Sequence, residues 1–156
     1  MRINLGCGND MRIGFVNVDK LPMNGPPELC RQGDIKSIDW LAEDGTVEEI
    51  IAIDCLEYLP LNSVQPAITN WASKLATNGV LKILVPDCFA IAKAFSQGQF
   101  SLGEFCQMLF GTQQQNDARL SAIDLDTLVK ILGEAGLVVS VKRYEGVAVY
   151  VEATKC

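Results

Sequence analysis

Histidine is absent from this chain of 156 residues, and several other features that would indicate a particular chemistry are missing with it. Without histidine neither a Ser-His-Asp triad nor a Cys-His pair can form. Most hydrolase chemistry is therefore excluded, and any general base must be Asp, Glu, Tyr, Lys or Cys. The six cysteines include no CxxC pair, and with no imidazole available the sequence predicts no metal site.

Basic charge and long apolar runs are also scarce. The net charge of −6 argues against a nucleic acid partner, because phosphate binding relies on a basic face. No run long enough to span a membrane occurs, and Met1–Leu5 leads directly into glycines and charges, unlike a signal peptide. We therefore expect a cytoplasmic protein without membrane contact, with one domain over residues 1–156.

What the sequence does contain is an alternation of short β-type runs and helical runs, which is typical of a parallel sheet covered by helices. Strands are expected at 2–5, 15–19, 49–54, 80–85, 138–144 and 147–153, with a short one near 33–35. Helices are expected at 62–78, from about 87, at 102–110 and at 124–136. Gly146 separates the last two strands with no helix between them, so they should form an antiparallel hairpin.

The helix expected at 62–78 has the clearest pattern, because Val64, Ile68, Trp71 and Leu75 recur at helical spacing and form one apolar stripe. Asn62 or Ser63 is expected to cap its start and Gly79 to end it.

Glycine or acidic residues end four successive strands. Gly6 and Gly8 follow the first strand, and Asp19, Asp34 and Asp54 end the next three. Ligands of open α/β sheets bind at these carboxyl ends, where glycine lets a ligand approach the backbone and a carboxylate can accept hydrogen bonds from a ribose. Any one of these aspartates alone would more often be a turn or cap residue. The ordered set favours a nucleoside site.

A nicotinamide site fits this loop less well. Met11 stands where a GxGxxG fingerprint has its third glycine, and Asp19 follows Gly8 by only 11 residues, where roughly 20 are expected. A Walker phosphate loop is absent, since no GKS or GKT occurs.

The motifs in order resemble the class I S-adenosylmethionine-dependent methyltransferases, in particular a small bacterial type. The family patterns LNLGCGND, GFVNVD, LEHL and VPD correspond here to Ile3–Asp10, Gly14–Asp19, Leu56–Leu59 and the end of Leu75–Asp87. The resemblance implies a Rossmann-like three-layer sandwich with a mostly parallel seven-stranded sheet, strand order 3-2-1-4-5-7-6 and an antiparallel last strand. It also implies S-adenosylmethionine as cofactor, with S-adenosylhomocysteine as product. The residues that it places at the cofactor are Asn4, Gly6, Cys7, Gly8, Asp19, Lys20, Asp34, Ile35, Asp54 and Cys55.

Two positions depart from the family pattern. Tyr58 and Arg119 stand where the family often has histidine, and they affect the acceptor side of the site. The chain also opens at the first strand, which suggests an acceptor cleft that is open or completed by a second subunit, as in a homodimer. Candidate bases are Asp54, Glu57, Tyr58 and Asp87.

Several of these residues have an alternative interpretation. Glu57 can equally brace the next helix, Tyr58 can simply pack, and Arg119 can either attract an anionic acceptor or be a solvated charge. Trp40 can stack near an adenine, although a tryptophan on such a turn more often belongs to the core.

Two functions remain open at this point. One is an active methyltransferase on a small-molecule or glycan-like acceptor, where the glycan preference comes from the resemblance alone. The other is a catalytically inactive module that binds S-adenosylmethionine or a partner protein through a surface around 102–110.

Overall fold

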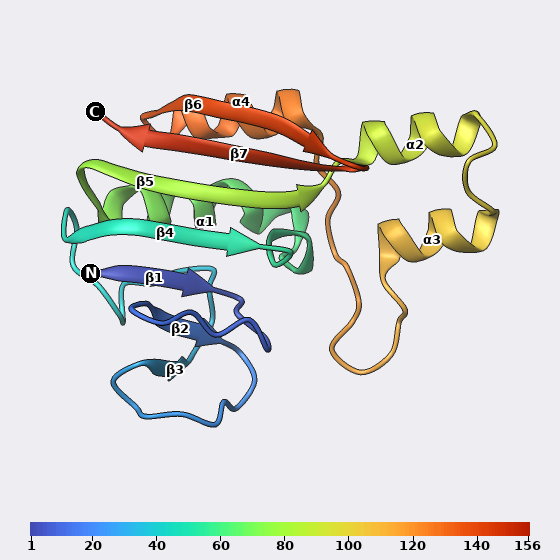
Figure 1. Cartoon of the computed structure of the whole chain (residues 1–156). Helices are drawn as coiled ribbons and strands as arrows, with labels where there is room; N and C mark the ends of the chain where they lie inside the picture. The colour runs from blue at the N-terminus through green and yellow to red at the C-terminus, as the bar shows by residue number, and fades with distance from the viewer.

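The computed structural model describes all residues, 1–156, and seven strands of the chain form one sheet (Figure 1). The strand order is β3-β2-β1-β4-β5-β7-β6, as predicted. β7 is antiparallel to both of its neighbours, and every other neighbouring pair is parallel. The strands are β1 (Arg2–Leu5), β2 (Val16–Asp19), β3 (Cys30–Gln32), β4 (Val47–Ile53), β5 (Leu75–Pro86), β6 (Leu137–Glu145) and β7 (Ala148–Lys155).

The reversal of β7 depends on a tight turn. β6 and β7 stay paired as far as Glu145 and Ala148, so only Gly146 and Val147 connect them. Gly146 has φ +63°, a left-handed conformation that glycine adopts without a steric penalty. The predicted antiparallel hairpin is confirmed.

Two helices, α1 and α4, lie side by side behind the sheet in Figure 1, and two others, α2 and α3, lie beyond the carboxyl ends of the strands. We call α2, α3, their connection and the residues that follow α3 up to Gln113 (88–113) the arm. The helices are α1 (Leu61–Lys74), α2 (Cys88–Ser96), α3 (Leu102–Phe110) and α4 (Leu125–Glu134), with a 3₁₀ turn η1 (Leu56–Tyr58) before α1. No helix is long and apolar enough to cross a membrane.

The second face of the sheet has no helical layer, which makes the confirmed Rossmann-like fold thinner than the expected three-layer sandwich. The connections 6–15 and 20–29 contain no helix, and a helical crossover between parallel strands takes a dozen or more residues. This face carries charged side chains, such as Lys82 of β5, whose Nζ lies 2.7 Å from the Glu49 carboxylate of β4.

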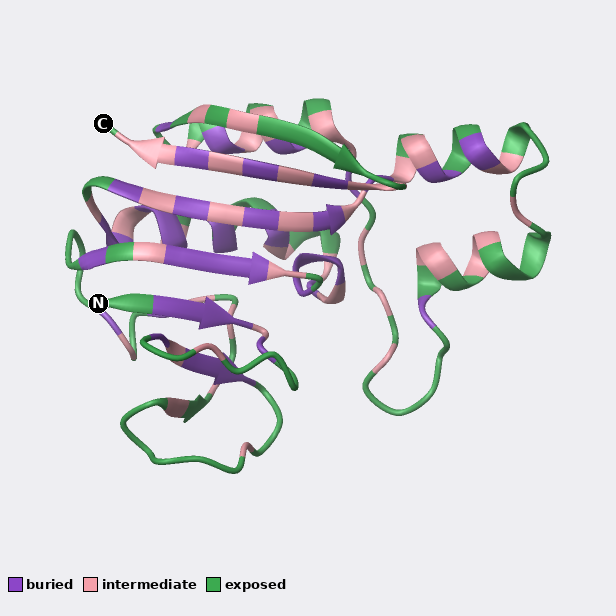
Figure 2. Cartoon of the chain, viewed as in Figure 1, coloured by how far each residue is buried: buried purple, intermediate pink, exposed green.

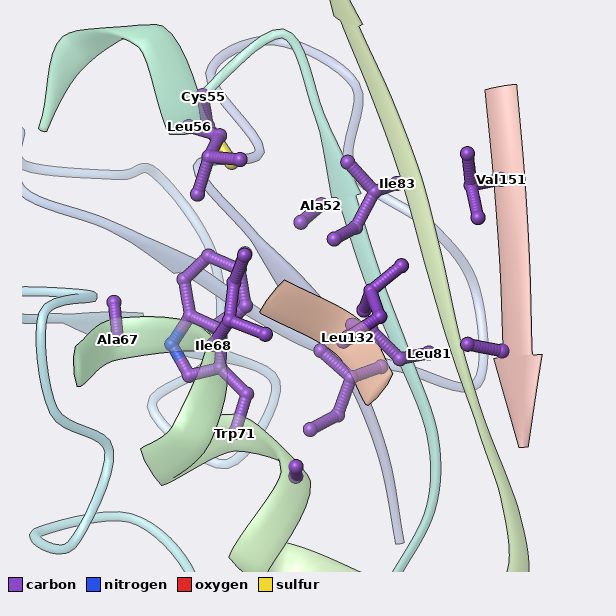
Figure 3. Packing of buried hydrophobic residues seen from close by; sticks show 14 of the residues in the cluster. Ala52, Cys55, Leu56, Ala67, Ile68, Trp71, Leu81, Ile83, Leu132 and Val151 are labelled. Carbon is purple, nitrogen blue, oxygen red and sulfur yellow. The ribbon is translucent and has the colours of Figure 1, made fainter. Parts of the chain in front are cut away.

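The core lies between the sheet and the helices α1 and α4 (Figure 3). Alternate residues of β5 point into it, with Leu81 and Ile83 fully buried on either side of Lys82. Trp71 of α1 is also fully buried, and its indole N–H donates to the carbonyl of Ile35 at 2.7 Å. This bond ties the chain after β3 to the core and positions it at the carboxyl edge of the sheet.

Three local predictions were wrong. The short strand forms at Cys30–Gln32 rather than 33–35, because this segment pairs with β2. The helix expected to reach 78 ends at Lys74, since Leu75 pairs with Val47 as the first residue of β5. Its start has Pro60 at the cap position, with no side-chain cap from Asn62 or Ser63.

Gly79 therefore does not end a helix but lies within an irregular stretch of β5. A Cβ at this position would come within 2.8 Å of the carbonyl oxygens of Ala76 and Val47. The glycine allows a close approach of backbones, which a sequence pattern does not distinguish from a helix end.

Candidate functional site at the carboxyl edge

The loop after β1 contains two glycines in left-handed conformations, Gly6 with φ +61° and Gly8 with φ +48°. A Cβ on Gly6 would clash with the Cβ of Cys55, which follows β4. A Cβ on Gly8 would meet no atom within 4 Å. Gly6 is therefore required for packing between neighbouring strand ends, whereas the backbone at Gly8 is open to an approaching group.

Asp19, at the end of β2, turns its carboxylate toward this loop. One oxygen accepts from the Gly8 N–H and the other from the Leu21 N–H, both at 2.9 Å, and the residue is 9% exposed. A carboxylate oxygen has two lone pairs, so each can still accept a second hydrogen bond. Asp19 thus fixes the loop and retains the capacity to bind hydroxyl groups.

Two further residues of the predicted cofactor set, Asn4 and Cys7, are buried beneath the loop surface and stabilise the loop from inside the protein. The Asn4 amide is buried and donates to the Asp10 carbonyl at 2.7 Å and to the Asn17 side chain at 3.0 Å. The Cys7 thiol is buried 3.2 Å from the Met23 sulfur, and burial raises its pKa to about 11. Cys7 therefore remains a neutral thiol and is no nucleophile at neutral pH.

The remaining candidates near β2 and β3 are more exposed. One Asp34 oxygen accepts from the Lys36 N–H at 2.9 Å in a local turn, and Lys20 is exposed. Ile35 packs partly against the core, and its carbonyl holds Trp71. These residues lie along the carboxyl edge as expected, but the structure shows no contact between Asp34 and the glycine loop.

Trp40 is not a core residue. It is 47% exposed, and its ring packs so closely on Gly33 that a Cβ there would clash with it. Its indole N–H donates to the Ser37 carbonyl at 2.9 Å, which fixes the orientation of the ring. An exposed, fixed aromatic side chain therefore lies beside Asp34.

Asp54 directly follows β4 in an unusual backbone conformation for a non-glycine residue, with φ +47°. Such strain of about 1–3 kcal/mol is often found at functional sites. The residue is exposed, and partial burial of its carboxyl raises the pKa, which Arg119 lowers in turn. Cys55, by contrast, is buried against Gly6, and burial holds its pKa well above the ordinary value.

Glu57 and Tyr58 of η1 face different surroundings. Glu57 is only 3% exposed, neither carboxylate oxygen has a hydrogen-bond partner, and burial raises its pKa to about 7. Tyr58 is half-buried, and its hydroxyl donates to one Asp117 oxygen at 2.8 Å. Of these three among the four candidate bases, Asp54 and Tyr58 are accessible, and Glu57 is not.

Asp87 has a structural position. It is fully buried, and its two oxygens accept from the Ala90 N–H at 2.6 Å and the Leu125 N–H at 2.8 Å. It thereby caps α2 and joins the start of α4 to it. With both oxygens engaged inside the protein, it is poorly placed to act as a base.

A groove in the arm lies beside Asp117, the hydrogen-bond partner of Tyr58. Its volume is about 560 Å³, and its lining consists of Gly103, Cys106, Gln107, Phe110, Gly111, Thr112 and Gln113. Asp117 connects the groove to η1, because its second oxygen accepts from the Thr112 N–H at 2.9 Å and the Thr112 hydroxyl at 2.5 Å. The bonds from Thr112 and Tyr58 lower the pKa of Asp117 to about 2, so it is ionised and holds both.

The sequence predicted a partner surface around 102–110, where part of this groove lies, but it did not predict an acceptor groove or the position of Asp117. One available signal was the low charge of residues 88–116, which include only Lys93 and Glu104 as charged side chains. The buried residues of this segment are Ile91 and Ala94 of α2 and Gly111, and α3 has no buried residue (Figure 2). A segment with so few charges that contributes little to the core indicates a surface with another use.

Solved structures with the same fold are S-adenosylmethionine-dependent methyltransferases. One from Mesorhizobium loti has a TM-score of 0.70 at 11% identity, over 99% of this chain and 90% of its own. One from Methanosarcina mazei has a TM-score of 0.66 at 11% identity, over 98% of this chain and 91% of its own. An O-methyltransferase family protein from Burkholderia thailandensis has a TM-score of 0.64 at 17% identity over 98% of this chain, which spans half the length of that protein.

The chain therefore has the fold of the class I S-adenosylmethionine-dependent methyltransferases, and the resemblance stated from its motifs is confirmed for the fold. The sequence matches no protein-family model and no curated protein.

Proposed function

We propose that the protein is an S-adenosylmethionine-dependent methyltransferase. The observation that carries this proposal is the pairing of Asp19 with the open backbone at Gly8, at the carboxyl ends of β1 and β2. Open α/β sheets bind their ligands at this edge. A carboxylate with free lone pairs beside an unobstructed glycine suits a ribose and the chain attached to it.

The cofactor would be held by the residues that line this edge. Gly8 would offer its backbone and Asp19 its carboxylate, with Asn4, Gly6 and Cys7 shaping the loop. The same edge also holds Asp34 and Ile35 after β3, Lys20 after β2, and Asp54 and Cys55 after β4. When bound, S-adenosylmethionine supplies an activated methyl group on a sulfonium and becomes S-adenosylhomocysteine after transfer.

The groove in the arm supports an uncharged acceptor, a small molecule or a glycan-like compound. Its side chains offer amide groups at Gln107 and Gln113, a hydroxyl at Thr112 and an aromatic face at Phe110, and no charge. Amides can hydrogen-bond hydroxyl groups, and an aromatic ring packs against the apolar face of a ring compound.

The protein's chemical task is mainly to align the acceptor and exclude water. If the acceptor atom carries a proton, a base must take it as the new bond to carbon forms. Asp54 is the accessible carboxylate nearest to this role, since it is exposed and its pKa is raised by partial burial. Tyr58 would then orient the acceptor between the strand end and the groove.

Calorimetric titration with S-adenosylhomocysteine tests the proposal directly. We expect micromolar binding by the wild type, weaker binding by Asp19→Ala, and unchanged binding by the matched surface variant Glu28→Ala. Absence of binding by the wild type to either S-adenosylmethionine or its product would refute a cofactor site.

A screen with methyl-labelled cofactor and neutral hydroxyl compounds then tests catalysis. Label transfer supports the enzyme. Cofactor binding without transfer to any acceptor would instead support the inactive binding module.

A further inference from the structure

Residues 117–121, the docked segment, connect the arm to α4 and lie against η1. The Leu120 and Ser121 N–H groups both donate to the Glu57 carbonyl, at 2.8 and 3.1 Å. Tyr58 adds its bond to Asp117. In Figure 1 the chain after α3 runs down past the strand ends and returns to α4, so these contacts fix an otherwise long connection.

A cavity lies under this contact, with two unpaired polar groups at its wall. Both Glu57 oxygens and the Arg119 Nε are buried without a hydrogen-bond partner, and both residues line the cavity together with Cys88 and Ser121. Its volume of about 10 Å³ admits one water molecule at most. Arg119 is held toward the arm instead, because its Nη1 donates to the Met108 carbonyl at 2.5 Å.

The charges around Glu57 are mostly of its own sign. Asp54 at the end of β4 and Asp117 in the docked segment are acidic, the Cys55 and Cys88 thiols are neutral, and Arg119 is the cation among them. An ionised Glu57 would therefore be a buried charge without a hydrogen bond, beside two carboxylates and one cation that points elsewhere.

We infer that Glu57 is a positioning residue whose buried carboxyl must carry a proton for the docked segment to bind most tightly to η1. Because Asp117 belongs to this segment and holds Thr112, release of the segment would also loosen the groove. The expected effect of this release on acceptor binding rests on the proposed function, whereas the docking of the segment on η1 does not.

The direction in which docking depends on pH follows from the raised pKa of Glu57. The pKa of Glu57 is raised from 4.5 to about 7 in the docked state. Docking is therefore strongest below pH 4.5, and its equilibrium constant falls by up to about tenfold per pH unit as the pH rises toward 7. Above the docked-state pKa the dependence levels off.

Hydrogen exchange of the Leu120 and Ser121 amides measures docking without cofactor or acceptor. We expect protection factors, corrected for the intrinsic exchange rate, to fall in the wild type between pH 5 and pH 7.5. Glu57→Gln keeps the shape of the side chain but has no charge to gain, so protection should stay flat. The matched control Glu28→Gln, at an exposed position, should behave as the wild type.

A second variant removes the cation near Glu57 and so raises the pKa of its carboxyl instead of removing the carboxyl. Arg119 lowers the pKa of Glu57 in the docked state, so Arg119→Gln should make the fall in protection larger and extend it to higher pH, even though loss of the bond to Met108 weakens docking at every pH.

Flat protection in the wild type, or an unchanged pH profile in Glu57→Gln, would overturn the inference. Either result is independent of calorimetric binding of S-adenosylhomocysteine, so a failure here is distinguishable from a failure of the proposed function.

Discussion

The two halves of the carboxyl edge are built differently. At β1 and β2 the buried polar groups are paired: Asp19 accepts from two backbone N–H groups, and the Asn4 amide donates to two partners. At β4 the opposite holds, since Glu57 is buried with no partner at either oxygen and Arg119 has an unpaired Nε.

The difference shows what each half is suited to do. A fully paired network is rigid and presents the same surface at all times, as a site for a common cofactor requires. Unpaired buried groups cost free energy, and such regions are easily displaced. The β4 half also carries the arm, whose α3 has no buried residue, so the proposed acceptor side is the more adaptable of the two.

The largest effect on stability is expected in the β1 and β2 half, at the close contact between Gly6 and Cys55. Gly6→Ala should destabilise the protein by about 3 kcal/mol or more, because it combines a left-handed conformation with a clash against Cys55. Urea denaturation measures the change. Gly8→Ala is the matched control, since it has a left-handed φ but free space, and about 1–2 kcal/mol is expected.

Gly8→Val then separates binding from stability. It should fold and yet bind S-adenosylhomocysteine poorly, because its side chain fills the space at the loop. Normal calorimetric binding by this variant would contradict the assignment of the loop.

A smaller effect is expected at Asp19. Asp19→Ala should weaken S-adenosylhomocysteine binding by about 1–3 kcal/mol, through loss of charge-assisted hydrogen bonds and of the bond that fixes Gly8. Titration of folded protein is the measurement, with Asp34→Ala for comparison at an exposed carboxylate of the same edge. Equal losses in the two variants would remove the distinction between them.

On the β4 side, Tyr58→Phe should cost about 1 kcal/mol of docking, because it removes one hydrogen bond to an ionised Asp117. The expected readout is faster hydrogen exchange at Leu120 and Ser121 with unchanged cofactor affinity. Unaltered turnover on an identified acceptor would show that the hydroxyl transfers no proton.

The smallest effect concerns Trp40, one of two tryptophans. Trp71 is fully buried, so a change of fluorescence on adding S-adenosylhomocysteine should come from the exposed Trp40 beside Asp34. Trp40→Phe should abolish this change while altering stability by about 0.5 kcal/mol or less. A response that persists in the variant would place the nucleoside elsewhere.

Much of the scaffold could be predicted from local patterns. The strands β1 and β2, the hairpin at Gly146 and the position of Asp19 at a strand end follow from short apolar runs and their terminating residues. These signals are local, because alternation and turn residues act over a few positions.

The failures have a common physical cause. Gly79 was taken for a helix end, but its role is a close approach to Val47, which is distant in sequence. Likewise, nothing next to Glu57 in the sequence shows that Ser121 and Arg119 seal it from water. Such contacts depend on which segments meet, and a local pattern contains no information about that.

The sequence by itself determined most of the strands and the line of glycine and acidic residues that follows them, because each strand end is set by its own neighbours, and the strand order came from the family resemblance. Only the tertiary structure decided which carboxylates are paired, which are accessible and which is sealed. Hydrogen bonding and desolvation depend on the atoms packed around a group, and for Glu57 and Asp117 those atoms come from segments about sixty residues apart.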